Sequence, residues 1–154
     1  MMTLCCKVLQ VLEGKTLSTA ESCTGGMIGQ LLTAVSGASA VYKGGVISYC
    51  NEVKENALGV SGQVLAEKGA VSAPVAQAMA AGVRRLMDTD VAVSVTGLAG
   101  PRGDEFGNPV GTVFIGYADR DMVISRQFLF AGSREEVRLQ AAQEALKLIC
   151  EHNS

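Results

Sequence analysis

Apolar residues recur at helical spacing near both ends of the chain. At the N-terminal end they predict a helix over residues 3–13 that stops at Gly14. At the C-terminal end they predict a helix over residues 134–149. Ser133 and Glu136 have the spacing of a capping box, in which each side chain satisfies a free N–H group at the start of the helix.

The middle of the chain alternates between strand and helix patterns. β-branched and apolar runs predict five strands, at residues 15–20, 40–49, 90–97, 110–118 and 122–130. Further helices are predicted at residues 24–35, 51–58 and, as a short helix followed by a long one, within 59–87. This order predicts one α/β domain over residues 1–154, a three-layer α/β/α sandwich with a central mixed β-sheet.

Composition narrows the class of protein. The chain has 48% hydrophobic residues, which excludes a disordered chain, but no apolar run near the roughly eighteen residues of a membrane span. The net charge is −2 and the basic residues are scattered, so neither nucleic acid nor membrane is expected as a partner. The N-terminus lacks the features of a secretion signal, which leads us to expect a cytoplasmic protein.

Cysteine and histidine usage limits the chemistry. The five cysteines include no C-x-x-C pair, and the only histidine, His152, is the third residue from the C-terminal end. A disulfide framework and a zinc site are therefore not expected, and we predict no metal and no cofactor. If the protein catalyses acyl transfer, its base is expected to be something other than histidine.

The segment "AESCTGG", residues 20–26, lies between a predicted strand and a predicted helix. Ser22, Cys23 and Thr24 each carry a nucleophilic group, and the N–H groups around Gly25 and Gly26 could instead hold an anion. Neither a P-loop nor a G-x-S-x-G pattern is present. An ordinary helix cap at Ser22 or Thr24 explains the local pattern equally well.

Lys54 is the candidate base. With Asn51 as N-cap, it would occupy the first helical turn, where the helix dipole disfavours a cation and lowers the lysine pKa. The other interpretation is a solvated surface lysine. In the absence of a usable histidine, a Ser–Lys pair is the natural arrangement for nucleophilic catalysis.

Two further segments concentrate small polar residues. Residues 36–39 end in Ser39, which has no local reason to be serine, and residues 96–103 contain Thr96 followed by a glycine loop. That loop can form an oxyanion hole or a phosphate nest, or be an ordinary connection. Because ligands gather at one edge of an open α/β sheet, these segments together predict one cleft.

Five blocks in series carry a family resemblance: "TAESCTGG", "SGASAVYKGGVISYCNEVKENALGV", "GAVSAPVAQAMA", "AVSVTGLAGP" and "NPVGTVFIG". Together they resemble the C-terminal domain family of CinA, in its stand-alone form. The resemblance implies hydrolysis of nicotinamide mononucleotide to nicotinic acid mononucleotide and ammonia, in pyridine nucleotide recycling, by a Ser–Lys dyad. It also implies a homodimer.

The resemblance assigns roles to individual residues. Ser39 is expected to be the nucleophile and Lys54 the base, with Ser22, Tyr49 and Thr96 supporting them; Ser22 remains the second candidate for the nucleophile. The expected substrate-binding residues are Thr24, Gly25, Gly26, Gly97, Gly100 and, for the phosphate, Arg138 with Arg134 as alternate.

Departures from the family pattern leave other functions open. Ala38 and Cys50 replace usual serines, and "AGPRGDEFGNP" differs from the usual loop in a way that can alter substrate fit. The alternatives are an amidase with another substrate, or a non-catalytic nucleotide-binding module linked to competence or DNA damage.

Overall fold

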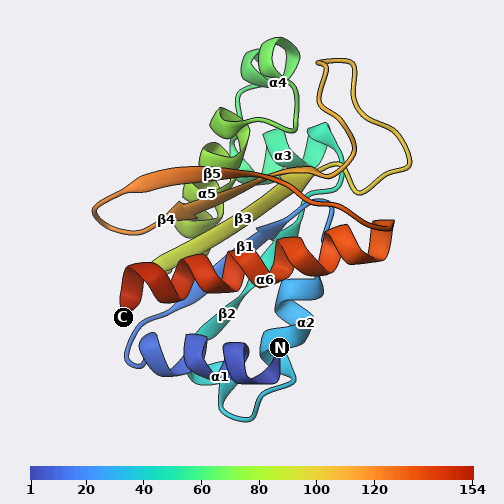
Figure 1. Cartoon of the computed structure of the whole chain (residues 1–154). Coiled ribbons are helices and arrows are strands. Elements are labelled where there is room, and N and C mark those ends of the chain that lie inside the picture. The colour runs from blue at the N-terminus through green and yellow to red at the C-terminus, as the bar shows by residue number, and fades with distance from the viewer.

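The computed structural model describes all 154 residues and contains one five-stranded sheet with the order β2-β1-β3-β4-β5 (Figure 1). The prediction of an α/β fold with a mixed sheet is confirmed, and the strands and helices follow one another in the predicted order. The strands are β1 (Leu17–Glu21), β2 (Tyr42–Ile47), β3 (Val91–Gly97), β4 (Thr112–Ala118) and β5 (Val123–Leu129).

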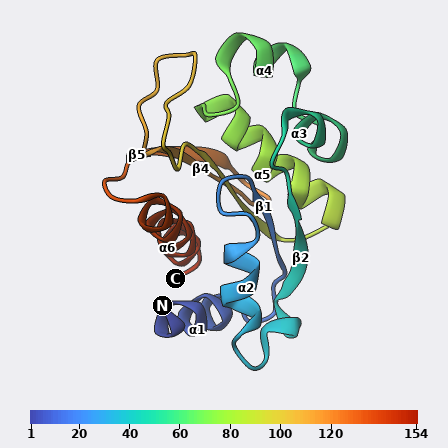
Figure 2. The ribbon, with the colours of Figure 1, turned by 90° about the vertical axis from the view of Figure 1, so that its right-hand side faces the viewer.

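Helices cover both faces of the sheet (Figure 2). One face carries α1 (Met2–Val11), α2 (Met27–Thr33) and α6 (Arg134–Asn153), and the other carries α3 (Asn51–Leu58), α4 (Gly62–Lys68) and α5 (Ala73–Met87). A hydrophobic core lies on each side of the sheet, and the larger one is beneath α1, α2 and α6. No helix is both long and apolar enough to cross a bilayer.

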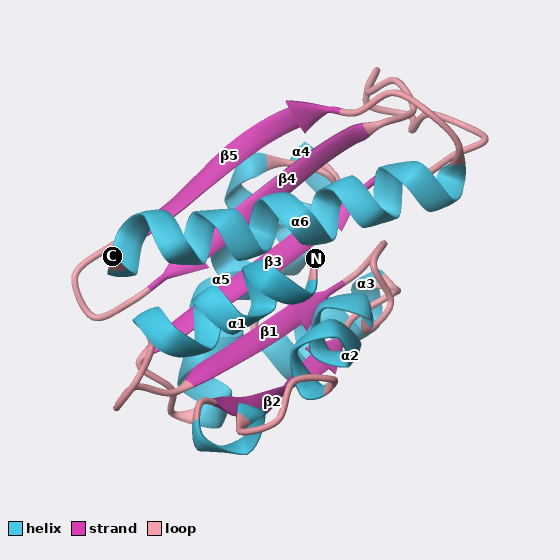
Figure 3. Cartoon of the chain, turned by 60° about the horizontal axis from the view of Figure 1, so that its bottom comes forward, coloured by secondary structure: helices cyan, strands magenta, loops and turns pink.

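Strand direction decides where a site can form. β2, β1 and β3 are neighbours and run parallel, whereas β4 is antiparallel to β3, and β5 to β4. The α6 helix lies across the sheet on the face that it shares with α1 (Figure 3). The carboxyl ends of the three parallel strands therefore meet at one edge, which is where open α/β sheets bind ligands.

Helix ends differ from the predictions by a few residues. The last helix extends to Asn153, because its final turns bury Ile149 and Cys150 against the core. In α3 the N-cap is Cys50 and Asn51 is already helical, without a side-chain cap. Lys54 consequently lies one position further into the helix than predicted.

Gly82 allows α5 to pack closely against α3. A Cβ atom at this position would lie 1.9 Å from the carbonyl oxygen of Leu58, which is too close for any residue other than glycine. Leu58 is the last residue of α3, so this approach fixes the helix that carries Lys54 against α5.

Candidate active site at the carboxyl ends of the parallel strands

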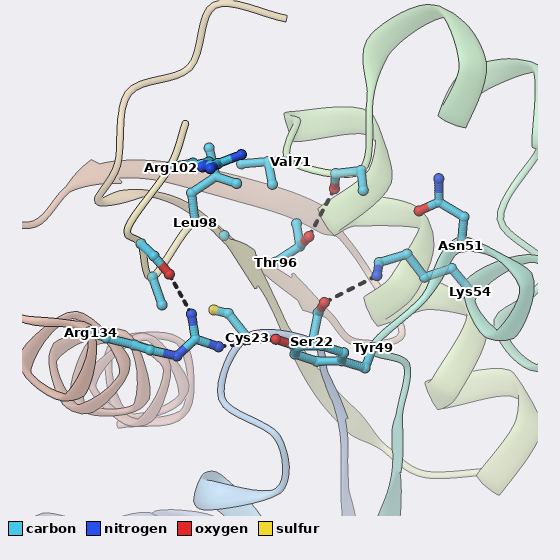
Figure 4. A pocket seen from close by; sticks show the side chains of 14 residues that line it. Ser22, Cys23, Tyr49, Asn51, Lys54, Val71, Thr96, Leu98, Arg102 and Arg134 are labelled. Carbon is cyan, nitrogen blue, oxygen red and sulfur yellow. Dashed lines mark hydrogen bonds between the residues drawn. The ribbon is translucent and has the colours of Figure 1, made fainter. Parts of the chain in front are cut away.

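A pocket of about 290 Å³ opens at the carboxyl edge of the parallel strands (Figure 4). Ser22 follows β1, Tyr49 follows β2 and Thr96 lies at the end of β3, while Lys54 reaches the same space from α3. The structure thus gathers four of the five predicted catalytic residues in one pocket. The volume lies near the lower end of the range typical of small-molecule sites.

Ser22 and Lys54 are in direct contact at the base of this pocket. The Nζ atom of Lys54 lies 3.1 Å from Ser22 Oγ and donates a hydrogen bond of 2.7 Å to the carbonyl oxygen of Ser48. Both side chains are buried, with Lys54 only 2% exposed. A neutral amine held by one donated hydrogen bond can direct its lone pair at the serine hydroxyl and accept the proton.

Burial lowers the pKa of Lys54, because removing the ammonium group from water penalises its charged form. No carboxylate contacts Nζ to offset this penalty. The predicted direction of the shift is therefore correct, but its main cause is desolvation rather than the helix dipole. A lysine with a lowered pKa is suited to act as a general base.

The turn after β1 does not offer the N-terminus of α2 to a ligand. The buried carboxylate of Glu21 accepts hydrogen bonds from the N–H groups of Ile28 and Gly29, at 2.9 and 3.1 Å. The predicted anion site at this helix start is thus occupied by the chain itself. Thr24, Gly25 and Gly26 do not line the pocket, which corrects their predicted role in substrate binding.

Arg138 does not reach the pocket either. Its Nε donates to the carbonyl oxygen of Cys23 at 2.9 Å, and its Nη2 donates to that of Thr24 at 3.1 Å. The arginine that lines the pocket is Arg134, one helical turn earlier on α6. The alternate assignment of the phosphate arginine therefore fits the geometry, whereas the preferred one does not.

The end of β3 and the loop that follows it form the opposite wall. Thr96 Oγ1 donates to Ala70 O at 2.8 Å, and the pocket surface continues through Gly97 and Gly100. Arg134 donates to the carbonyl oxygen of Gly100 and, at 3.0 Å, to the phenolic oxygen of Tyr49. Arg134 thus joins the loop after β3 to the segment after β2 at the mouth of the pocket.

Ser39 lies outside this site. It is an exposed residue of a short 3₁₀ helix (Ala38–Ala40) and borders a separate depression together with Thr33 and Lys43. It precedes β2 whereas Lys54 follows it, and a six-residue strand is about 20 Å long. The expected pairing of Ser39 with Lys54 is therefore corrected to one of Ser22 with Lys54.

The charge of the pocket lining is one-sided. Lys54, Arg102 and Arg134 line it, and no Asp or Glu does. No group of three or more His, Cys, Asp or Glu side chains in the protein is arranged to hold a metal ion. The site is therefore suited to a ligand that carries negative charge at the end near the two arginines.

Several residues of the pocket lining were not predicted from the sequence. Arg102 lies in the loop that was noted as unusual, but nothing in its pattern indicated that this residue would border the pocket. Ala70 and Val71, before α5, line the pocket without any distinguishing sequence signal. Cys23 also lines it, and burial raises the pKa of its thiol to about 11, so it remains protonated at neutral pH.

Comparison of the sequence with known proteins identifies one family over nearly the whole chain. Residues 3–152 match the model of the CinA C-terminal domain family. A CinA-like protein of Geobacter sulfurreducens is 49% identical over 134 residues, which cover 87% of this chain and 32% of the relative. A putative competence-damage inducible protein of Moorella thermoacetica is 46% identical with the same coverage. The chain thus spans about a third of the length of these relatives.

Solved structures give the same result. A CinA superfamily protein of Klebsiella pneumoniae superimposes with a TM-score of 0.94 at 36% identity, covering 97% of this chain and 95% of the other. A competence/damage inducible protein of Agrobacterium tumefaciens gives a TM-score of 0.95 at 36% identity, covering 99% and 95%. By sequence and by fold, this chain belongs to the CinA C-terminal domain family.

Proposed function

We propose that the protein is an amidohydrolase that converts nicotinamide mononucleotide to nicotinic acid mononucleotide and ammonia, with Ser22 as nucleophile and Lys54 as base. The observation that carries this proposal is the buried contact of 3.1 Å between Lys54 Nζ and Ser22 Oγ. Burying an amine with no carboxylate partner destabilises the fold. Such an arrangement is typical of a site that needs a neutral lysine.

In the first half of the reaction, Ser22 Oγ attacks the carboxamide carbon of the substrate while Lys54 takes the hydroxyl proton. The carbonyl double bond opens and its oxygen becomes an oxyanion, which backbone N–H groups at the pocket wall stabilise. The ammonium group of Lys54 then gives its proton to the amide nitrogen. Ammonia leaves, and an ester of Ser22 with the nicotinoyl group remains.

In the second half, a water molecule takes the place of the ammonia. Neutral Lys54 removes a proton from this water as it attacks the ester carbon, and the same proton returns to Ser22 Oγ when the ester bond breaks. The carboxylic acid product ionises in water. The sum is one amide and one water consumed, and one carboxylate and one ammonium formed.

The phosphate of the nucleotide fits the other end of the pocket. Arg102 and Arg134 lie there, and both are exposed enough to meet a hydrated anion. The N–H groups of Ala99 and Gly100 donate to no other group of the protein and lie in the same wall. Guanidinium groups and free backbone N–H groups are the usual ligands of phosphate in proteins.

The direct test is to incubate the protein with nicotinamide mononucleotide and measure both ammonia and nicotinic acid mononucleotide. Ser22→Ala and Lys54→Met are each expected to lower kcat by at least about 10⁴-fold. Ser39→Ala is the matched control, because it removes a serine hydroxyl outside the pocket, and it is expected to keep normal turnover.

Other outcomes would change the proposal in defined ways. Normal turnover by Ser22→Ala would exclude Ser22 as nucleophile. Binding of the nucleotide by the wild-type protein without release of ammonia would favour the non-catalytic nucleotide-binding module. Release of ammonia from another amide alone would keep the dyad and change the substrate.

A further inference from the structure

Asn51 lines the pocket without contributing a cap or a side-chain hydrogen bond to the fold. The sequence predicted it as the N-cap of α3, yet the N-cap is Cys50, and Asn51 is the first helical residue. Asparagine is a poor helix former whose side chain normally serves in caps and turns. A residue that breaks a local preference without a local compensation is where a functional constraint is expected.

The hydrogen-bonding groups of the pocket single out the same residue. Most lining side chains that carry nitrogen or oxygen have partners within the protein: Ser22, Tyr49, Lys54, Thr96 and Arg134. The side chains of Arg102 and Asn51 have none. Arg102 can only donate, whereas Asn51 supplies the only side-chain carbonyl of the lining, because no Asp, Glu or Gln lines the pocket.

Asn51 lies on the side of the pocket from which Lys54 enters. The two residues are three positions apart on α3, so their side chains project from one face of the helix. Arg102 and Arg134 enter from the opposite side (Figure 4). In the proposed reaction Lys54 delivers a proton to the amide nitrogen. That nitrogen and its hydrogens therefore lie on the α3 side of the pocket, away from the arginines.

A carboxamide brings two N–H donors into this site, and donors removed from water need acceptors. Guanidinium groups cannot accept, and the single lone pair of neutral Lys54 is directed at the hydroxyl of Ser22. The carbonyl oxygen of Asn51 can accept. An aspartate at this position would also accept, but its negative charge would raise the pKa of Lys54 and reduce the amount of neutral base.

We infer that Asn51 is a specificity-determining residue that accepts a hydrogen bond from the N–H group of the substrate carboxamide and so selects primary amides over esters of the same acid. This inference rests on the proposed function. An ester carries an oxygen without hydrogen in place of the amide nitrogen, so it cannot donate to Asn51. The residue thus acts on the leaving group and not on the phosphate.

The test compares two substrates that differ only in the leaving group: nicotinamide mononucleotide and the methyl ester of nicotinic acid mononucleotide. Both form the same acyl-enzyme, and kcat/KM reports the steps that lead to it. Asn51→Leu removes the acceptor at similar size, and Asn51→Asp keeps an acceptor. Asn56→Leu is the matched control, because Asn56 is an exposed asparagine of α3 that does not line the pocket. Circular dichroism reports folding, and Asn51→Ala replaces Asn51→Leu if that variant does not fold.

The measured quantity is kcat/KM for the amide divided by kcat/KM for the ester. Asn51→Leu is expected to lower this ratio about 10-fold, the value of a hydrogen bond whose donor is otherwise left without an acceptor. Asn51→Asp should keep the ratio while lowering both rates, and Asn56→Leu should change neither. An unchanged ratio in Asn51→Leu would overturn the inference. Equal losses for both substrates would show that Asn51 contacts a part that they share, such as the ribose.

The proposed substrate and the role of Asn51 fail in different ways. A wild-type protein that hydrolyses another primary amide but not nicotinamide mononucleotide would refute the proposed substrate alone. The same ratio, measured with that amide and its methyl ester, would then decide the role of Asn51. A wild-type protein that hydrolyses no primary amide would overturn both.

Discussion

Lys54 Nζ meets Ser22 Oγ at 3.1 Å although the two residues are 32 positions apart in the sequence. They meet because β1 and β2 are parallel neighbours, so the segments that follow these strands leave the sheet at the same edge. The contact has two consequences that can be measured, one in the pH dependence of activity and one in stability.

Activity should rise with pH and level off below the ordinary pKa of lysine. Burial lowers the pKa of Lys54 from its usual 10.5, and only the neutral amine can accept the proton of Ser22. The rate is therefore lost as pH falls through the lowered pKa. Measuring kcat/KM against pH tests this, and a rate that continues to rise beyond pH 10.5 would contradict it.

Removing Lys54 should leave the fold as stable as before or more so. The folded state disfavours the charged lysine, so at neutral pH protonation of Lys54 costs folding free energy, and this cost disappears as pH rises towards the unfolded pKa. Lys54→Met has a similar length and no charge to desolvate. Its melting temperature at pH 7 should equal or exceed that of the wild type, and the difference should shrink at pH 10. A lower melting temperature at pH 7 would indicate that the lysine stabilises the fold.

Arg102 and Arg134, the two arginines at the pocket mouth, should contribute to binding of the nucleotide. Arg102→Ala and Arg134→Ala are each expected to raise KM for the nucleotide roughly 10-fold, the value of one hydrogen bond to a charged group, with a smaller effect on kcat. Neither should affect turnover of nicotinamide riboside, the nucleoside that lacks the phosphate. The prediction fails if the variants lower kcat/KM by the same factor for both substrates, because the arginines would then not recognise the phosphate.

Cys23 should resist alkylation in spite of lying beside the proposed nucleophile. Burial raises the pKa of its thiol to about 11, so little thiolate exists at pH 8, whereas Cys6 and Cys50 are exposed. Brief treatment with iodoacetamide followed by peptide mass spectrometry should find label on Cys6 and Cys50 first. Rapid labelling of Cys23 would show that its thiolate is accessible.

The sequence predicted the order of strands and helices well, because hydrophobic periodicity reflects burial directly. The sequence was less informative about whether a given loop lies at the amino end or at the carboxyl end of a strand. Ser39 was grouped with the site because it adjoins a strand, yet it lies at the amino end of β2, where parallel strands do not form ligand sites. Applying strand direction to the predicted elements would have favoured Ser22.

Side-chain direction was the second limit. Arg134 and Arg138 are one helical turn apart on α6, so their sequence spacing places them on the same face. Only the packed structure shows that one reaches the pocket while the other turns to the backbone of Cys23 and Thr24. Likewise, the pattern around Lys54 indicated a lowered pKa but not the depth of burial that causes it.

The hydrogen bonds from Ile28 and Gly29 to Glu21 have a consequence for the direction in which a substrate enters. A helix start beside a nucleophile would normally compete with the arginines for any anionic group. Since Glu21 already occupies this helix start, the pocket has a single anion-binding end, on the side of Arg102 and Arg134. A molecule with an amide at one end and a phosphate at the other then has one favourable orientation, with the amide at Ser22. A buried carboxylate that does not line the pocket thereby helps to decide which way round the molecule binds.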